Sequence, residues 1–342
     1  MPKTNRDRRP GEPLLDIGSY ARRGPDGRSL SPEQTAQIAR TVRRTPEVMV
    51  KVLRHGGKDQ GAVQRHFDYL SRKGELDIET DDGQLLVGRG SERELLSGWD
   101  LDLEEWRPQS RLTARTGKAP PRLAHKLIFS MPAGTAPTKV LSAVREFCRE
   151  EFALKHRYAM VLHTDEPHPH VHVVVKAVSE QGVRLNIKKA DLRAWRAEFA
   201  RQLRAQGVAA NATERAPRGV TGLRKFDSIF RAMQRGASTH LRAQLAELSN
   251  YGATPMPKPD AGVARLRATR REVERGWLAV SQELERAGQL ELAKETRAFV
   301  ADMTPPRSDQ EILAALSDAG RAQRSPDQGP GADPAAGREL GG

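Results

Sequence analysis

The chain has little of several residue types that mark other classes of protein. Its single cysteine, Cys148, cannot form a disulfide within the chain, which excludes a disulfide scaffold and fits a reducing compartment. No run of about eighteen apolar residues is present, and the N-terminal residues lack an apolar signal core. We therefore expect a cytoplasmic protein without a membrane span and without conventional secretion.

Acidic residues are too few to balance the basic ones. The 57 Lys and Arg residues against 44 Asp and Glu residues give a net charge of +13. Between Asn186 and Arg235 twelve basic residues face four acidic ones, a local excess of eight positive charges. Such an excess favours a polyanion, with nucleic acid as the first choice of partner. The alternative is a solvated helix face that a partner protein neutralises.

The sequence pattern divides the chain into four segments. Residues 1–45 are predicted to be a flexible basic arm with a short helix, which the pattern Ser31, Pro32, Glu33, Gln34 opens as a capping box. Residues 46–215 mix strand and helix patterns, residues 216–320 carry helical patterns only, and residues 321–342 are predicted to be a disordered tail rich in Pro, Gly and Ala.

The mixed segment predicts an α+β fold with an antiparallel sheet and helices packed on one side of it. The hairpin is expected around residues 81–83, and a polar connection at 98–121. The predicted strands are 48–53, 126–131, 156–162 and 171–175, and the predicted helices are 61–74, 138–152 and 189–206. In the C-terminal region, Ser308 and Glu311 are predicted to open a last helix.

The stretch HTDEPHPHVHVVV holds four of the nine histidines within ten residues. On a strand, His170 and His172 point to the same face with Cα atoms roughly 7 Å apart, so both imidazoles can bind one ion. His163, across a proline-containing turn, could deliver a third nitrogen, whereas prolines flank His168 and make its reach doubtful. Three imidazoles suit Zn, Mn, Co or Ni better than Ca, and they leave coordination positions open for catalysis. A structural role for the histidines is the alternative.

Tyrosine is scarce, and Tyr69 stands out among the four. In the helix AVQRHFDYL the apolar stripe of Val63, Phe67 and Leu70 turns Tyr69 away from its centre, which suits a phenol that faces a cleft; the alternative is packing, the commoner role of such a residue. Arg72 and Lys73 follow directly and either contact phosphates or form a basic helix end.

Together three motifs resemble a known family. DYLSRKGELDIE at 68–79, HKLIFSMPAGT at 125–135 and HTDEPHPHVHVVV at 163–175 are similar to motifs of the relaxases of mobile plasmids, in the branch that includes the T-DNA border endonuclease. The resemblance covers about residues 47–215. It implies a metal-dependent nickase of the histidine-triad superfamily, which cuts one strand at a transfer origin and stays joined to the new 5′ end.

The resemblance also implies roles for single residues. Tyr69 matches the nucleophile, and His163, His170 and His172 match the metal triad, with Mg or Mn as the expected ion. Asp165 matches the acid of the HxD portion; it would help to deprotonate the phenol or would orient a ligand histidine, and both roles stay open. His66, one helical turn before Tyr69, has the spacing of a base, but the motif does not demand histidine there, so a surface role is favoured.

Single-stranded and origin DNA are the expected partners, with accessory relaxosome proteins, a type IV coupling protein and export through a type IV secretion system as further implications of the resemblance. Trp195 and Phe199 are expected to pack the helix rather than to stack on bases. Two other functions stay open: a rolling-circle replication initiator and a non-catalytic DNA-binding accessory protein. The expected phosphate contacts are Arg72, Lys73, Lys188, Lys189, Arg193, Arg196, Arg204 and Arg215.

Overall fold

The computed structural model describes residues 15–23, 29–53, 57, 59–101, 121–220, 261–308 and 311–312. The described residues form two compact units, one within 1–214 and 276–301 and the other within 215–275 and 302–342. The predicted boundary after residue 215 lies beside this division, although residues 276–301 belong with the first unit. The predicted tail at 321–342 lies outside the described residues. None of the described helices combines the length and the apolarity that crossing a membrane requires.

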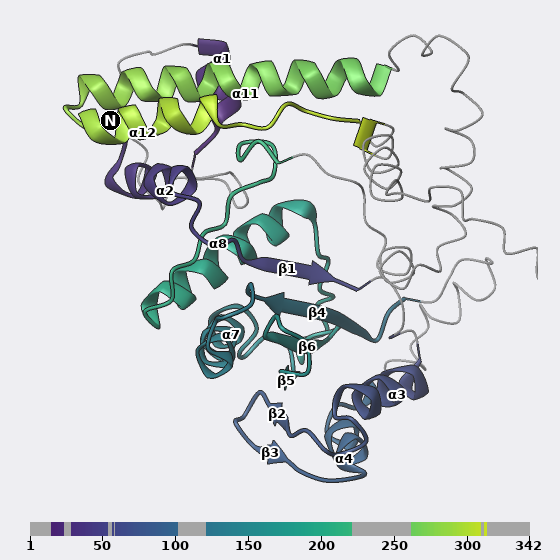
Figure 1. The fold of residues 1–342 in the computed structure, drawn as a ribbon. Helices are drawn as coiled ribbons and strands as arrows, with labels where there is room; N and C mark the ends of the chain where they lie inside the picture. The colour runs from purple at the N-terminus through teal and green to yellow at the C-terminus, as the bar shows by residue number, and fades with distance from the viewer. Residues whose placement is uncertain are drawn as a thin grey trace, which may run out of the picture. The chain divides into compact units, whose positions relative to one another are not determined.

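The first unit is built on one six-stranded sheet (Figure 1). Its strands lie in the order β1-β4-β6-β5-β2-β3, and every neighbouring pair runs antiparallel. This confirms the predicted α+β class and the antiparallel sheet. The strands are β1 Met49–Val52, β2 Ile78–Thr80, β3 Leu85–Leu86, β4 Ala124–Ser130, β5 Tyr158–His163 and β6 His170–Lys176.

Helices cover both faces of this sheet, and the prediction that they pack on one side is wrong (Figure 1). Strand β6 explains the difference, because neighbouring side chains of a strand point to opposite faces. Val173 joins the core beneath one helix pair, whereas Val174 joins the core beneath the other. The first pair is α7 Pro137–Glu151 and α8 Lys189–Ala205, and the second pair is α3 Gln60–Leu70 and α4 Ser91–Ser97.

The core beneath α7 and α8 is rich in aromatic side chains. The ring of Phe129 on β4 lies 4.8 Å from that of Phe147 on α7 and 5.2 Å from that of Phe199 on α8. Trp195 is also buried there, 3% exposed, so the prediction that Trp195 and Phe199 pack the helix is confirmed. These contacts make β4 and β6 a rigid support for the side chains on the opposite face of the sheet.

Helix α3, which covers the second core together with α4, has a well-formed N-terminus. The Asp59 side chain accepts a hydrogen bond from the Ala62 N–H at 2.6 Å and caps α3. Helix α4 was not predicted, and the prediction of a polar connection from residue 98 is wrong at its start. Trp99 and Leu101 are fully buried in this core, where Trp99 meets the Phe67 ring edge-on at 5.8 Å. Residues 102–120 lie outside the described part of the chain.

The remaining helices are α1 Ile17–Arg23, α2 Pro32–Val42, α11 Ala261–Arg286 and α12 Leu290–Ala301. The predicted capping box is present, since Ser31 and Gln34 exchange hydrogen bonds of 3.2 and 3.0 Å. Helix α1 packs closely on α11: a Cβ added at Gly276 would meet the Ile17 carbonyl oxygen at 2.2 Å. The predicted arm therefore contributes packed helices to the first unit.

In the second unit, Arg270 donates hydrogen bonds of 2.6 Å to the carbonyl oxygens of Gly219 and Thr304. Ser308 and Glu311 exchange hydrogen bonds of 3.1 and 2.6 Å, which confirms the predicted helix start.

Candidate active site

The paired ends of β5 and β6 bring three histidines together. In the strand register His163 lies opposite His170, and His172 lies opposite Val161, with both β6 histidines on the α3/α4 face. Each histidine offers one ring nitrogen, and these nitrogens lie within 4.8 Å of one another. The predicted convergence of the three imidazoles is therefore present. His168 lies outside the cluster.

In two of these histidines, hydrogen bonds decide which ring nitrogen carries the lone pair. His163 Nε2 lies 2.7 Å from the Leu70 carbonyl oxygen, and His170 Nδ1 lies 3.0 Å from the His168 carbonyl oxygen. A carbonyl oxygen only accepts, so these nitrogens donate, and the lone pairs stay on His163 Nδ1 and His170 Nε2. His172 Nδ1 is buried without a hydrogen-bond partner among the described residues. This donor set fits a divalent cation.

Burial favours the neutral form of two of these imidazoles. The pKa of His172 is lowered to about 3, chiefly by burial and further by His163 and His170. Burial also lowers the pKa of His163, and the Arg72 charge adds to the effect. A metal binds the neutral imidazole, so at neutral pH neither ring must lose a proton before it can coordinate a cation.

Helix α3 presents Tyr69 to solvent beside the three histidines. Val63, Phe67 and Leu70 are buried on one side of the helix, and Tyr69 is 61% exposed, as the helical pattern predicted. Tyr158, in contrast, is buried in β5, where burial raises the pKa of its phenol far above the ordinary value. Tyr69 is therefore the accessible phenol near the cluster.

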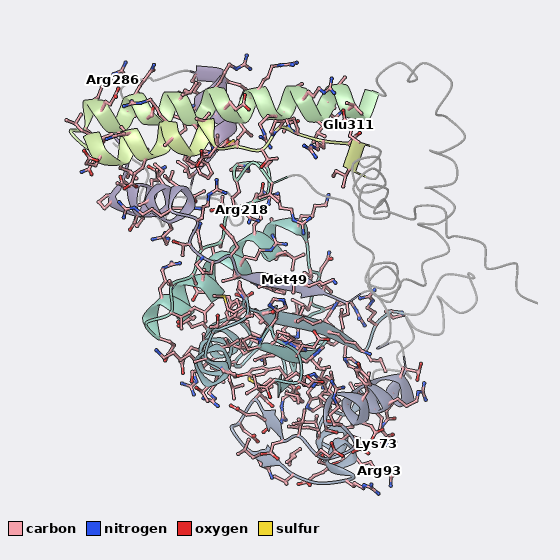
Figure 2. All side chains as sticks on the ribbon, in the orientation of Figure 1. Met49, Lys73, Arg93, Arg218, Arg286 and Glu311 are labelled. Atoms are coloured by element: carbon pink, nitrogen blue, oxygen red, sulfur yellow. The ribbon has the colours of Figure 1, made fainter. Side chains whose placement is uncertain are left out.

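A tight turn after α3 depends on the residues SRKG. Arg72 and Lys73 both adopt left-handed backbone conformations, with φ of 51° and 59°, and Gly74 follows with φ of 90°. Residue 74 has to be glycine, since an added Cβ would lie 2.3 Å from the Gly88 carbonyl carbon. The helix thus ends at Leu70 and not at the predicted position 74. Lys73 reaches solvent beside α4 (Figure 2).

The turn places Arg72 between the phenol and the histidines. Its guanidinium carbon lies 5.0 Å from the centre of the Tyr69 ring, and its Nη2 lies 2.6 Å from Asp165 Oδ2 and 3.4 Å from His163 Nδ1. The hydrogen bond from Arg72 lowers the pKa of Asp165 and weakens this carboxylate as a base. The Leu70 carbonyl, and not Asp165, holds the second nitrogen of His163.

Two further residues face this site. His66 is half-buried, with its ring 6.5 Å from the rings of both Tyr69 and His172, and burial lowers its pKa to about 4. The surface role that the sequence favoured for His66 is therefore wrong. Lys126 on β4 is 6% exposed, and burial lowers its pKa to about 8. Neighbouring side chains of a strand point to opposite faces, and the apolar Leu127 belongs to the α7/α8 core. This alternation along β4 was the sequence signal that could have placed Lys126 on the face of the histidines.

The basic stretch on α8 lies across the sheet from the histidines, since α8 packs on the other face. Arg204 donates a hydrogen bond of 3.0 Å to the Ala210 carbonyl oxygen, and Arg193 pairs with Glu214 at 3.3 Å. These two side chains have structural partners. Lys188, Lys189 and Arg215 are exposed. Contact between this stretch and DNA stays a prediction.

Part of the chain matches a known protein family. Residues 82–208 match the family model described as relaxase, MobA/VirD2-like, nuclease domain. The match starts after Tyr69 and contains Asp165 and all three histidines of the cluster. Residues 82–208 thus resemble the nuclease domain of the relaxases, in agreement with the resemblance that the motifs of the chain carry.

Individual relatives point to the same branch. The T-DNA border endonuclease VirD2 of Agrobacterium fabrum is 26% identical over 215 residues, which are 59% of this chain and 47% of that protein. VirD2 of Rhizobium radiobacter is 28% identical over 192 residues, 51% of this chain and 43% of the relative. The chain thus spans about half the length of the relatives that it matches.

Two solved structures are also similar to part of the chain. One is the MobM relaxase domain bound to plasmid pMV158 oriT DNA in a Mn-bound crystal, with 11% identity and a TM-score of 0.36 over 55% of this chain and 98% of that one. The other, from work on vancomycin resistance transfer in Staphylococcus aureus, has 13% identity and a TM-score of 0.32 over 50% of this chain and 99% of that one. Scores this low do not establish a common fold.

Proposed function

We propose that this protein is a metal-dependent nickase that cuts one DNA strand at the transfer origin of a plasmid or integrative element and becomes joined to it through Tyr69. The observation that carries the proposal is an exposed phenol beside three converging imidazoles, with Arg72 in contact with both. The family of residues 82–208 supports the same reaction. The VirD2 relatives are named as endonucleases of T-DNA borders, which supports a DNA substrate.

The residues that would hold the cation are His163, His170 and His172. Three imidazole ligands favour Mn, Zn, Co or Ni by ligand type, and the family resemblance favours Mg or Mn. When bound there, a divalent cation supplies a positive charge that stabilises the charge developing on a non-bridging phosphate oxygen. A buried cluster beside an exposed nucleophile suits that task, since the charge acts where water is scarce.

In the proposed reaction Tyr69 Oη attacks the scissile phosphorus, and the bond from phosphorus to the 3′ oxygen breaks. The products are a 5′-phosphotyrosyl link and a free 3′-OH, so the phenol loses a proton and the departing oxygen gains one. Asp165 stays a candidate for handling this proton, but its ion pair with Arg72 makes it a weak base. The phosphotyrosyl link retains the energy of the broken bond, and attack by a 3′-OH reseals the strand.

We further propose that basic side chains near the site and on α8 contact the phosphates of the strand. Neutralising Lys188 and Lys189 together should flatten the dependence of DNA affinity on salt, by about 0.7 in slope for each lost contact. Arg72 and Lys73 would bind phosphates closest to the cut. Accessory proteins at the origin and a type IV coupling protein are the partners that piloting a strand into conjugative transfer requires.

The test is adduct formation on a supercoiled plasmid that carries its own transfer origin, with Mn²⁺ added and detergent used to trap the protein on DNA. Tyr69→Phe should bind the origin normally and give no covalent adduct. Tyr158→Phe is the matched control, because that phenol is buried in β5, and it should give the wild-type yield per folded molecule. A normal yield of adduct from Tyr69→Phe would refute the proposal.

A further inference from the structure

Arg72 occupies the nitrogen of His163 that a cation needs. The Leu70 carbonyl already accepts from His163 Nε2 at 2.7 Å, so the lone pair of this ring stays on Nδ1. Arg72 Nη2 lies 3.4 Å from that Nδ1. One lone pair cannot accept a hydrogen bond from a guanidinium and coordinate a cation at the same time. Arg72 and a bound cation therefore exclude each other at this atom.

The backbone shows that this placement of Arg72 is costly. A left-handed conformation is unfavourable for a residue with a Cβ, and Arg72 is followed directly by a second such residue, Lys73. Strain of this kind persists where the surrounding contacts hold it. Here the contacts are the 2.6 Å hydrogen bond to Asp165, the Tyr69 ring and a 3.2 Å hydrogen bond to the Tyr69 carbonyl oxygen.

We propose that Arg72 is a positioning residue that links cation loading to the placement of Tyr69. In the structure its guanidinium contacts both His163 and Asp165. If His163 Nδ1 held a cation, Arg72 would lose its contact with this nitrogen and would keep Asp165 and the Tyr69 ring as its partners. This inference rests on the proposed function, because it needs both a cation at the cluster and a reaction at Tyr69.

The proposal predicts two effects of opposite sign when Arg72 is removed. Cation affinity of the DNA-free protein should rise, because a competing donor and a nearby positive charge are both lost. The rate of adduct formation at saturating cation and DNA should fall, because Tyr69 loses the group that holds its ring. A purely structural role for Arg72 would instead weaken both properties.

The experiment measures Mn²⁺ binding by isothermal titration calorimetry on DNA-free protein. Arg72→Gln should bind Mn²⁺ roughly three- to tenfold more tightly than wild type. Arg72→Lys, which keeps the charge and loses the planar fork, should lie between the two. Arg65→Gln is the matched control, since Arg65 lies on α3 with a side chain 76% exposed and should leave affinity unchanged.

A second variant separates the two causes. Arg72→Gln with Asp165→Asn removes both charges of the ion pair, so any gain in affinity that survives comes from the freed nitrogen of His163. Melting curves without cation establish that each variant is folded. Gln at position 72 carries the same backbone strain as Arg, so the turn is expected to persist.

Equal or weaker Mn²⁺ binding by folded Arg72→Gln would overturn the role of Arg72 while leaving the proposed function intact. An unchanged rate of adduct formation in this variant at saturating Mn²⁺ would overturn it as well. Failure of the wild-type protein to bind Mn²⁺ at all would refute the proposed metal site, and this inference with it.

Discussion

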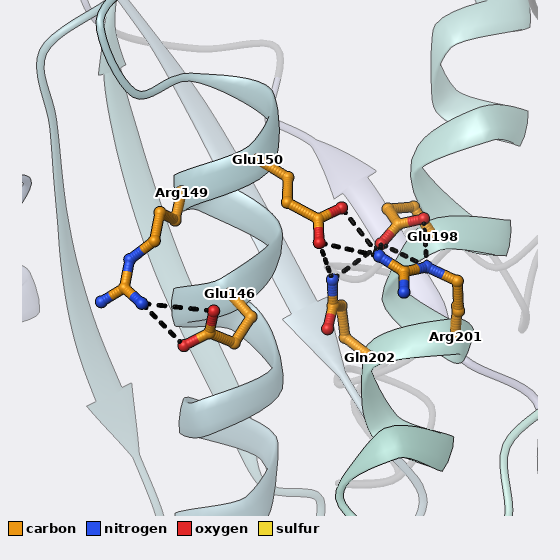
Figure 3. Close-up of polar contacts among 6 residues, drawn as sticks. All are labelled: Glu146, Arg149, Glu150, Glu198, Arg201 and Gln202. Atoms are coloured by element: carbon orange, nitrogen blue, oxygen red, sulfur yellow. Dashed lines mark hydrogen bonds and ion pairs between the residues drawn. The ribbon is translucent and has the colours of Figure 1, made fainter.

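Arg201 and Arg72 each centre a polar network, on opposite faces of the same sheet. Arg201 on α8 donates to Glu198 at 2.7 Å and to Glu150 of α7 at 2.8 Å (Figure 3). Gln202 donates to the same two carboxylates at 2.9 and 2.8 Å. Arg72, at the end of α3, meets one carboxylate, one neutral imidazole and one aromatic ring.

The difference between these networks separates a structural ion pair from a candidate site. Carboxylates surround Arg201, which raises its pKa, and the hydrogen bond from Arg201 lowers the pKa of Glu150. All the partners in that network belong to helices of ordinary geometry. Arg72 lies on a strained turn and contacts His163 Nδ1, the nitrogen that would coordinate a cation under the proposed function. The Arg201 network holds two helices together, whereas the contact of Arg72 with His163 Nδ1 would have to break for a cation to bind that nitrogen.

The largest effect that would sharpen the comparison is expected at the histidines. His163→Ala and His172→Ala should each lower the cleavage rate by about three orders of magnitude, or about 4 kcal/mol at the barrier, because each removes a ligand. Each should also abolish the rise in melting temperature that Mn²⁺ causes by mass action. His168→Ala is the control with a small effect, since it lies outside the cluster. Equal losses from all the histidine variants would contradict the assignment.

The α7/α8 face should respond to core truncation with lost stability and no lost chemistry. Phe147→Ala should lower the free energy of unfolding by about 3–4 kcal/mol, because Phe147 is fully buried among the rings of Phe129, Phe152 and Trp195. Urea titration measures this, and Leu154→Ala, at a side chain 96% exposed, should change stability little. A specific loss of adduct from folded Phe147→Ala would break the separation between the faces.

His125 gives the α7/α8 face a dependence on pH. Burial lowers its folded-state pKa from 6.5 to about 4, so the unfolded chain takes up a proton first as the pH falls. Stability that is present above pH 6.5 should therefore be lost between pH 6.5 and about 4, by at most about 3 kcal/mol. Unfolding free energies of wild type and His125→Gln, measured in EDTA at both ends of this range, isolate that loss. Parallel pH profiles would show that His125 contributes none of it.

The smallest effect is expected at Arg201. Its side chain is 52% exposed, so Arg201→Gln should cost no more than about 1 kcal/mol of stability, and less at high salt. Neither Mn²⁺ affinity nor adduct yield should change, in contrast to Arg72→Gln. If Arg201→Gln altered either property as strongly as Arg72→Gln did, the distinction between the two networks would fail.

Much of the first unit could be predicted from periodicity alone. The antiparallel β5 and β6, the helices α7 and α8 and the convergence of His163 with His170 and His172 follow from local alternation and turn residues. Helix α4 was missed because it is short and begins after a glycine in a left-handed conformation, without a side-chain cap. The second covered face was missed although β6 carries valines on both of its faces beyond the histidines, a pattern that indicates a strand covered on both sides.

The sequence by itself determined which chemistry the chain carries, because imidazoles at strand spacing and a phenol off an apolar stripe are properties of local pattern. Only the tertiary structure decided how these groups meet. Leu70 and His168 select the free nitrogens through backbone carbonyls, which have no sequence signature. Arg72 reaches Asp165 and His163 because a turn of α3 packs against strands about ninety residues later in the chain, a contact that only long-range folding creates.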